Sequence, residues 1–83
     1  MVNVIFKGPL ATSFGKEKIN LASSYSNIYD LLNDIDINGI LVNNGRIKSG
    51  YIILINGKDY RLFENKKIDN NDVIEIIPIN HGG

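Results

Sequence analysis

The sequence ends in Gly82 and Gly83, and no other residues of the chain have chemistry as distinctive. Glycine has no Cβ, so two successive glycines can take almost any φ and let another protein's backbone or a nucleotide phosphate approach closely. A carboxylate carried by such residues could enter a narrow channel and be activated there. We therefore expect Gly83 to be the reacting group and Gly82 to be the slim residue before it. The alternative, a frayed end without a role, is ordinary behaviour for chain termini.

Other side chains offer less chemistry. His81 is the only histidine, and its place beside the tail suggests an acid–base role, but a solvated residue is poorly held for catalysis. Three acidic residues lie close together in the first half of the chain: Asp30, Asp34 and Asp36. They lack a companion histidine and the spacing of a calcium-binding loop. We expect them to form a solvated helix face, and we expect no metal site.

Composition excludes several classes of function. At 83 residues the chain is long enough for one domain with one core. Lysine plus arginine equals aspartate plus glutamate at nine each, so the basic excess typical of proteins that bind nucleic acid or membranes is missing. The absence of cysteine excludes disulfides, thiolate metal sites and a cysteine nucleophile. No signal-peptide pattern opens the chain, and no apolar run approaches about 18 residues, so we expect a cytoplasmic protein.

The first half of the chain predicts two strands and a helix. Apolar and polar residues alternate over residues 2–7 and again over 17–22, which indicates two strands joined by a long loop. A helix is indicated by apolar residues at i, i+3, i+4 and i+7, namely Ile28, Leu31, Leu32 and Ile35. Ser24 or Ser26 could cap its first turn, and Gly39 could follow its end.

The second half predicts three more strands. Residues 40–50 indicate a connection with one short extended piece. Tyr51–Ile55 is a continuous β-favouring apolar run, as in a central strand covered on much of both faces, and an Asn-Gly turn follows it. We expect a short strand over Tyr60–Phe63 and a last strand over residues 73–77. Pro78 should end this last strand because proline lacks a backbone donor.

The order of these elements predicts an α+β domain of two layers. A β-grasp fits that order, with a mixed five-stranded sheet packed on one helix and the first and last strands parallel at the centre. We expect the domain to span residues 1–78. Residues 79–83 should then form a flexible tail, because Pro78 releases the chain from the sheet at an exposed rim.

The strand period also predicts a surface beside the tail. If Ile74 and Ile76 point at the helix, then Ile77 points away from it, and the charge at Glu75 supports this choice. The same reasoning places Ile5 outward on the first strand. Apolar residues on the outer face of adjacent strands commonly mark partner surfaces, although single surface isoleucines are also normal. The residues that we expect to bind partners are Ile5, Ile77, Pro78, Ile79, Asn80 and His81.

Several blocks of the sequence match the pattern of a known family. The most specific block runs without gaps from Asn71 to Gly83, with an aspartate, an apolar strand, a proline and a final Gly-Gly. The others are Phe14-Gly15-Lys16-Glu17 with Ile19-Asn20-Leu21, residues 26–35, and Leu54-Ile55-Asn56-Gly57. On these residues the chain resembles the MoaD/ThiS-type ubiquitin-like sulfur carriers, above all the small subunit of molybdopterin synthase. His81 and Asn80 depart from the small or apolar residues of many relatives, but neither disables the chemistry.

The resemblance implies a cycle of activation and sulfur transfer at Gly83. An E1-like adenylating enzyme of the MoeB/ThiF type would use ATP to adenylate the carboxylate, and a sulfur donor would convert the adenylate to a thiocarboxylate. In molybdopterin synthase this tail enters the large subunit, of the MoaE type, and donates sulfur to a pterin precursor. The resemblance therefore implies a non-catalytic carrier without a permanently bound cofactor.

The sequence leaves other functions open. A ubiquitin-like modifier conjugated to lysines would use the same adenylate, with an amine in place of sulfide as the nucleophile. The thiamine-pathway sulfur carrier resembles the tail, but it is usually shorter, so the length favours molybdopterin synthesis. A plain interaction module would not depend on the tail. Because the chemistry at Gly83 is shared, the sequence does not choose between cofactor synthesis and protein conjugation.

Overall fold

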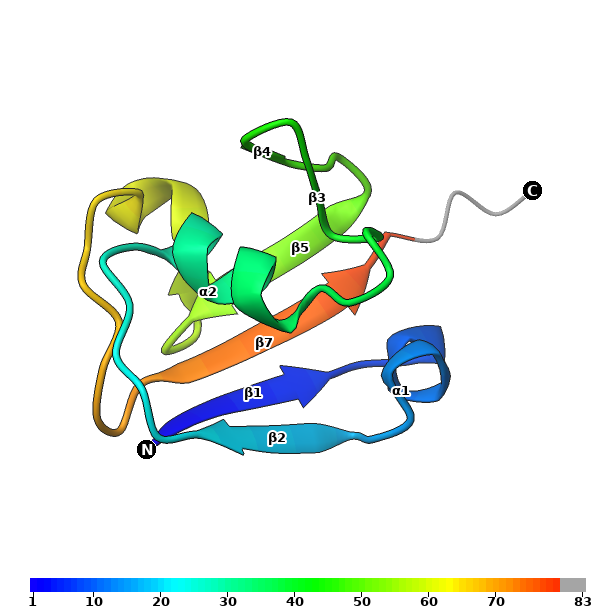
Figure 1. Cartoon of the computed structure of the whole chain (residues 1–83), viewed down its shortest axis with the longest axis horizontal. Coiled ribbons are helices and arrows are strands. Elements are labelled where there is room, and N and C mark those ends of the chain that lie inside the picture. Colours follow the sequence, from blue (N-terminus) through cyan, green and yellow to red (C-terminus); the bar gives the residue numbers. More distant parts are fainter. Residues whose placement is uncertain (80–83) are drawn as a thin grey trace.

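The computed structural model describes residues 1–79. Within them a five-stranded sheet and helix α2 form two layers (Figure 1). The strands of this sheet are β1 (Val2–Phe6), β2 (Lys18–Leu21), β5 (Tyr51–Ile55), β6 (Lys58–Asp59) and β7 (Val73–Pro78). The other elements are α1 (Pro9–Phe14), α2 (Ile28–Ile35), β3 (Val42–Asn43), β4 (Arg46–Ile47) and the 3-10 helix η1 (Tyr60–Phe63).

The sheet has the order β2-β1-β7-β5-β6. β1 pairs antiparallel with β2 and parallel with β7, and β7 pairs antiparallel with β5. The first and last strands of the chain are therefore parallel neighbours at the centre of the sheet. This confirms the predicted ubiquitin-like β-grasp, a mixed five-stranded sheet packed on one main helix.

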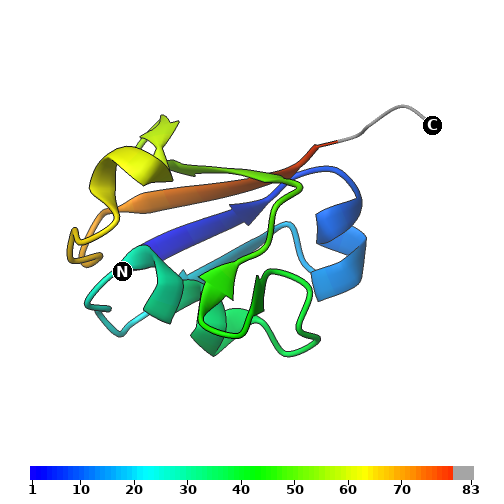
Figure 2. The same cartoon turned by 90° about the horizontal axis from the view of Figure 1, so that it is seen from above.

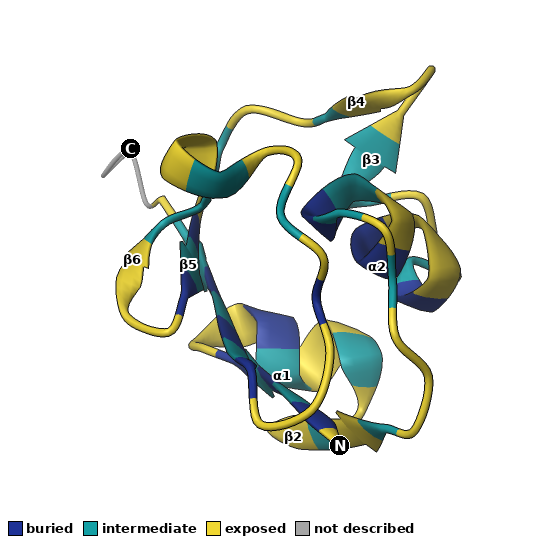
Figure 3. Cartoon of the chain, turned by 90° about the vertical axis from the view of Figure 1, so that its left-hand side faces the viewer, coloured by how far each residue is buried: buried dark blue, intermediate teal, exposed yellow. Residues whose placement is uncertain are grey.

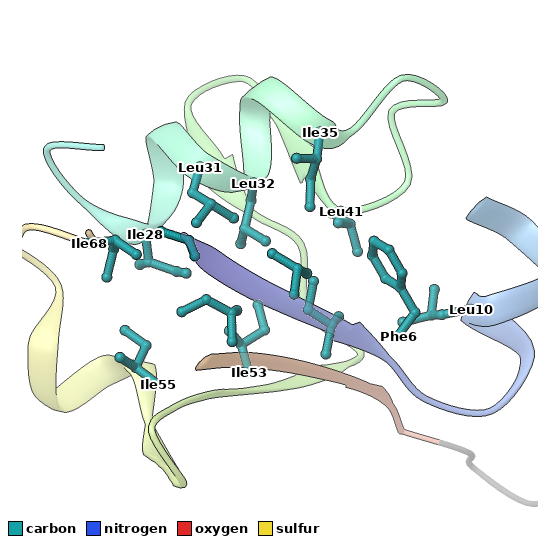
Figure 4. Close-up of a cluster of buried hydrophobic side chains, with 14 residues drawn as sticks. Phe6, Leu10, Ile28, Leu31, Leu32, Ile35, Leu41, Ile53, Ile55 and Ile68 are labelled. Carbon is teal, nitrogen blue, oxygen red and sulfur yellow. The ribbon is translucent and has the colours of Figure 1, made fainter. Parts of the chain in front are cut away.

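Alternate strand residues face α2 and form the core (Figure 4). Ile74 and Ile76 of β7 are completely buried, as the strand period predicted. Burying one such side chain contributes about 1.5–3 kcal/mol. Figure 3 colours parts of β5 and α2 as buried. The whole buried set is Val2, Val4, Phe6, Leu10, Ile28, Leu31, Leu32, Ile35, Leu41, Ile53, Ile55, Ile68, Ile74 and Ile76.

The connection between β1 and β2 is helical, which the sequence did not predict. Pro9 occupies the start of α1, where its fixed φ suits a helix and its missing N–H costs nothing. Leu10 is buried, and the ring of Phe14 stacks on Phe6 with 4.2 Å between centroids. These two apolar contacts hold a six-residue helix that has too short a pattern to be detected by periodicity.

Helix α2 begins and ends at different residues from those predicted. Its N-cap is Asn27, neither Ser24 nor Ser26, and the Asn27 side chain accepts a hydrogen bond from the Asp30 N–H at 2.9 Å. The helix ends at Ile35, before Gly39 is reached. The reason lies in Asp36, whose carboxylate accepts bonds from the backbone N–H groups of residues 40–42 and turns the chain.

Two predictions for the second half of the chain are wrong. Residues Tyr60–Phe63 form η1, not a strand, because the Asp59 carboxylate accepts the Arg61 N–H at 2.8 Å and caps a helical turn. β6 is consequently only two residues long. The connection over residues 40–50 contains a small hairpin of β3 and β4 in place of one extended piece.

Candidate functional site

The candidate site lies at the carboxyl end of β7, where the chain leaves the sheet. Backbone groups of alternate β7 residues face opposite neighbours. The Val73 carbonyl accepts a hydrogen bond from the backbone N–H of Asn56, which follows β5. The Ile76 carbonyl accepts one from the backbone N–H of Lys7, which follows β1. By this alternation the backbone of Pro78 faces β1, which has already ended at Phe6. Its missing N–H therefore costs no bond of the ladder.

Pairing continues one residue beyond Pro78, contrary to the prediction that this proline ends it. Pro78 lies within β7 opposite Tyr51. The next residue, Ile79, donates its N–H to the carbonyl of Gly50 at 2.8 Å. The described chain is thus held to β5 up to residue 79, and the sequence did not reveal Gly50 as its partner.

The outer face of the sheet beside this exit is apolar, as predicted. Ile77 and Ile5 both point away from the core and are half-buried, on the neighbouring strands β7 and β1. Figure 2 shows α2 on one side of these strands. The partial exposure of both side chains shows that the described part of the chain leaves the other side open to a partner.

β5 adds two residues to this surface, and here the sequence analysis was wrong. Tyr51–Ile55 was expected to be covered on much of both faces, but Ile52 is 43% exposed and Leu54 is half-buried. Ile52 lies opposite Ile77 in the register. We call Ile5, Ile52, Leu54 and Ile77 the outer patch. An unbroken run of apolar residues does not show which face of its strand is open, so only the register reveals it.

One acidic residue lies in the middle of the outer patch. Glu75 is opposite Leu54 on one side and level with Ile5 on the other. Lys7 lies 3.9 Å from its carboxylate, measured from Nζ to Oε2. An exposed pair at this separation contributes little to stability, so its charges remain available to a partner.

The opposite end of β7 is held by a polar cluster that we call the clasp, formed by Asp72, Asn56, Lys66 and the N–H of Asp69. The Asp72 carboxylate accepts bonds from the Asn56 side chain at 2.9 Å, from Lys66 Nζ at 3.1 Å and from the Asp69 N–H at 3.0 Å. The Asn56 side chain in turn accepts the Val73 N–H at 2.8 Å. These bonds join the turn after β5 to the start of β7.

The clasp favours the charged form of Asp72. Burial alone would raise the pKa of this carboxyl group, but the hydrogen bonds from Asn56, the Asp69 backbone and Lys66 outweigh burial and leave its pKa lowered. The residue is only 9% exposed, so solvent screens these bonds weakly. Asp72 therefore stabilises the fold at the end of β7 that lies away from the tail.

Two of the three acidic residues of the helix region, Asp34 and Asp36, accept hydrogen bonds and do not simply form a solvated helix face. Asp34 accepts a hydrogen bond from the hydroxyl of Tyr25 at 2.6 Å; burial, followed by this bond, raises the pKa of Tyr25 to about 12. Asp36 turns the chain after α2, as described above. Residues 1–79 contain no group of three potential ligands that could hold a metal ion. None of the helices in this part of the chain could cross a membrane.

The structure brings together four of the predicted site residues, namely Ile5, Ile77, Pro78 and Ile79, at one end of the sheet. The other four, Asn80, His81, Gly82 and Gly83, lie outside the described residues. The predictions for these residues therefore rest on the sequence.

Comparison with known proteins agrees with this architecture. The model of the ThiS family matches residues 4–83. Urm1 from Sulfolobus solfataricus is similar at 42% sequence identity and a TM-score of 0.83, over 93% of this chain and 99% of that chain. No match is found among curated proteins.

Two more distant structures share the fold. The small archaeal modifier protein SAMP1 from Methanosarcina acetivorans has a TM-score of 0.80 at 22% identity, over 99% of this chain and 95% of that chain. A putative molybdopterin converting factor, subunit 1, from Pyrococcus furiosus has a TM-score of 0.64 at 16% identity, over 95% of this chain and 97% of that chain.

Proposed function

This chain belongs to the ThiS family of ubiquitin-like sulfur carriers, and we propose that the carboxylate of Gly83 is its reacting group. An E1-like adenylating enzyme of the MoeB/ThiF type joins this carboxylate to AMP, and pyrophosphate leaves. A carboxylate is a poor acyl donor, whereas its mixed anhydride with AMP has a good leaving group. A sulfur nucleophile then attacks the acyl carbon, AMP leaves, and Gly83 becomes a thiocarboxylate.

The observation that carries this proposal is the position of the chain's exit from the sheet. β7 ends beside the half-exposed side chains of the outer patch. The Gly-Gly sequence begins at Gly82, four residues after Pro78. A partner that binds the outer patch is therefore adjacent to the start of the tail. We propose that Ile5, Ile77, Pro78 and Ile79 bind the activating enzyme. Asn80 and His81, as part of the tail, enter the channel of that enzyme and contact its walls.

In this proposal the carrier supplies no catalytic side chain. Many residues near the exit are apolar, and the charged residues there include two ion pairs, Lys7 with Glu75 and Arg61 with Asp59. ATP is a substrate of the activating enzyme, and the carrier holds no permanent cofactor. Acid–base groups for both steps come from the partners.

For the sulfur acceptor we propose the pathway of molybdenum cofactor biosynthesis. The thiocarboxylated tail enters the large subunit of molybdopterin synthase, of the MoaE type, and donates sulfur to a pterin precursor. The block from Asn71 to Gly83 supports this proposal through its resemblance to the small subunit. The chain length, greater than is usual for the thiamine-pathway carrier, also favours it.

A second candidate is a protein modifier joined to lysines. The fold shared with SAMP1, which is a modifier by name, motivates it, and so does the 42% identity with Urm1. The chemistry differs only in the nucleophile: a lysine amine attacks the activated carbonyl carbon of Gly83, AMP leaves, the nitrogen loses a proton, and an isopeptide bond forms.

Mass spectrometry of the activated protein distinguishes these functions. With an activating enzyme, ATP and a sulfur donor, we expect the intact mass to rise by one oxygen-to-sulfur exchange, located at Gly83 by fragmentation. Adding the large subunit and the pterin precursor should return the original mass and form molybdopterin. If the mass stays unchanged with several competent activating enzymes, the carrier function is wrong. If the thiocarboxylate persists with the pterin precursor but lysine-linked conjugates form in cell extract, the modifier function replaces it.

A further inference from the structure

The backbone bond between Ile79 and Gly50 restricts the exit of the tail. Hydrogen-bonded pairs between antiparallel strands recur at every second residue, so the pair before Ile79–Gly50 is Ile77–Ile52. Pro78 between them has no N–H to donate. Breaking the Ile79 bond therefore frees two residues, Pro78 and Ile79, from β5.

Gly50 has the backbone angle that this bond requires. Its φ is 101°, in the region that side chains disfavour, although nothing lies within 4 Å of where a Cβ would be. The glycine is thus needed for its backbone angle and not for space. In this conformation its carbonyl points to β7, just before β5 begins.

The side chain of Ile79 does little to hold the same residue. It is 40% exposed and lines an open hollow of about 350 Å³ together with Ile52, Tyr60 and Arg61. With so little packing around the side chain, the backbone bond is the main restraint on residue 79. A backbone hydrogen bond contributes only about 0.5–1.5 kcal/mol net, so binding of the tail by a partner can offset its loss.

We propose that the Ile79–Gly50 bond is a clamp that sets the working length of the tail, so that Ile79 and Gly50 are positioning residues for the reaction at Gly83. This inference rests on the proposed function. With the clamp closed, four residues follow Ile79 and reach at most about 14 Å. With the clamp open, Pro78 and Ile79 are also free; because they already run extended along β5, they add no reach in the strand direction, but they let the tail swing toward a reacting centre that lies to one side of the strand. They must then be ordered when the tail enters its channel.

The clamp thus couples tail length to affinity. If the reacting centre lies to one side of the strand, a tail shortened by one residue can still reach it, but only when the clamp opens. Removing the clamp and shortening the tail should therefore not have independent effects, because the shortened tail has already lost the clamp in the bound state. An ordinary bond at the end of a strand would show no such coupling.

The test uses three variants of the full chain with an activating enzyme and ATP–pyrophosphate exchange. The first replaces the Ile79 backbone N–H by an ester oxygen through chemical synthesis, the second deletes Asn80 and keeps Gly82-Gly83, and the third combines both changes. The chemically synthesised all-amide chain, which retains the Ile79 N–H and every side chain, is the matched control. Single-turnover formation of the adenylate, measured over a range of carrier concentrations, separates KM from kcat.

We expect the ester to raise KM about tenfold, through the two extra residues that must be ordered, with kcat within about twofold. Deletion of Asn80 should lower kcat/KM about tenfold for the same reason. The kcat/KM of the combined variant should lie within about threefold of that of either single variant. Two independent tenfold losses would instead multiply to roughly a hundredfold loss. The synthetic all-amide chain should stay within about twofold of the original protein.

Two results would overturn the clamp while leaving the proposed function intact: multiplied losses in the combined variant, or an unchanged KM in the ester. Hydrogen exchange of the Ile79 amide gives a readout that needs no enzyme, and we expect slower exchange than in an unstructured peptide. Unprotected exchange would exclude the bond itself. If the original protein gives no pyrophosphate exchange although Ile79 is protected, the clamp exists, the proposed function is wrong, and the positioning role is wrong with it.

Discussion

The two ends of β7 are held in different ways. At the Val73 end the clasp surrounds a carboxylate that is 9% exposed with three donors, one of them charged. At the Pro78 end a single backbone bond holds Ile79 beside half-exposed apolar side chains. The fold therefore concentrates its polar bonds at the end away from the tail. Stability and the proposed chemistry are separated along one strand, so variants at the two ends should have different effects.

The largest effect is expected at Gly82, which should matter for activity and not for stability. Gly82→Val adds a β-branched side chain where the partner's channel must be narrowest. We expect adenylation to fall by about a thousandfold or more, a rise in the barrier of about 4 kcal/mol. His81→Ala is the matched comparison: it removes side-chain contacts with the channel but adds no bulk and removes no acid–base group of the reaction, so its loss should stay below about tenfold. Equal losses in both variants would mean that the tail residues act as a unit and would give His81 a role.

The clasp should show the reverse behaviour. Asp72→Ala removes a buried carboxylate and leaves the Asn56 amide and the Lys66 ammonium without their partner, so we expect a loss of about 3 kcal/mol in the free energy of unfolding by urea. Asp69→Ala keeps the backbone N–H that donates to the Asp72 carboxylate, and it removes only an exposed carboxylate. It should cost less than about 0.5 kcal/mol. Adenylation by folded Asp72→Ala should be unchanged; a specific loss of activity would place the clasp in the site.

Neighbouring residues of β7 separate the two roles more finely. Ile77→Lys changes the outer patch, and we expect binding to the activating enzyme to weaken about thirtyfold, or about 2 kcal/mol, by calorimetry. The melting temperature should hardly move. Ile76→Lys places the same charge in the core, where it costs several kcal/mol, and should unfold the protein. Unfolding of Ile77→Lys would show that its side chain is part of the core.

A smaller effect concerns pH at the clasp. The pKa of Asp72 is lowered in the folded protein, whereas it is about 3.9 in the unfolded chain. The folded protein thus binds this proton less readily, so the contribution of Asp72 is fully present above about pH 4 to 5 and is lost as pH falls through the folded value. The difference in unfolding free energy between the original protein and Asp72→Asn should shrink from pH 7 toward pH 3. A difference that stays constant would mean that the charge of Asp72 is not what stabilises the clasp.

The sequence was sufficient to predict the core strands and the helix. Val4, Ile74 and Leu31 recur with the period of their elements, and burial against one common interior fixes which side they face. The outward positions of Ile5 and Ile77 followed from the same period. The parallel centre of the sheet followed from the order of elements.

What the sequence missed depends on contacts between distant residues. α1 is held by Leu10 and Phe14 through packing on other elements, and η1 by a side-chain cap from Asp59. The pairing of Ile79 with Gly50 requires the register of β5 on β7, which no local pattern contains. The Asn-Gly turn was predicted, but not that its Asn56 also joins the clasp.

The most direct test of the reacting group is ATP–pyrophosphate exchange measured beside a melting curve, for the original protein and for a variant lacking Gly83. The deletion removes up to about 3.6 Å of reach, and even with the clamp open it leaves His81 at the position that Gly82 should occupy. We predict exchange with the original protein, exchange reduced to background with the deletion, and the same melting temperature for both. Retained exchange in the deletion variant would contradict activation at Gly83, and a large fall in melting temperature would show that the terminal glycine supports the fold.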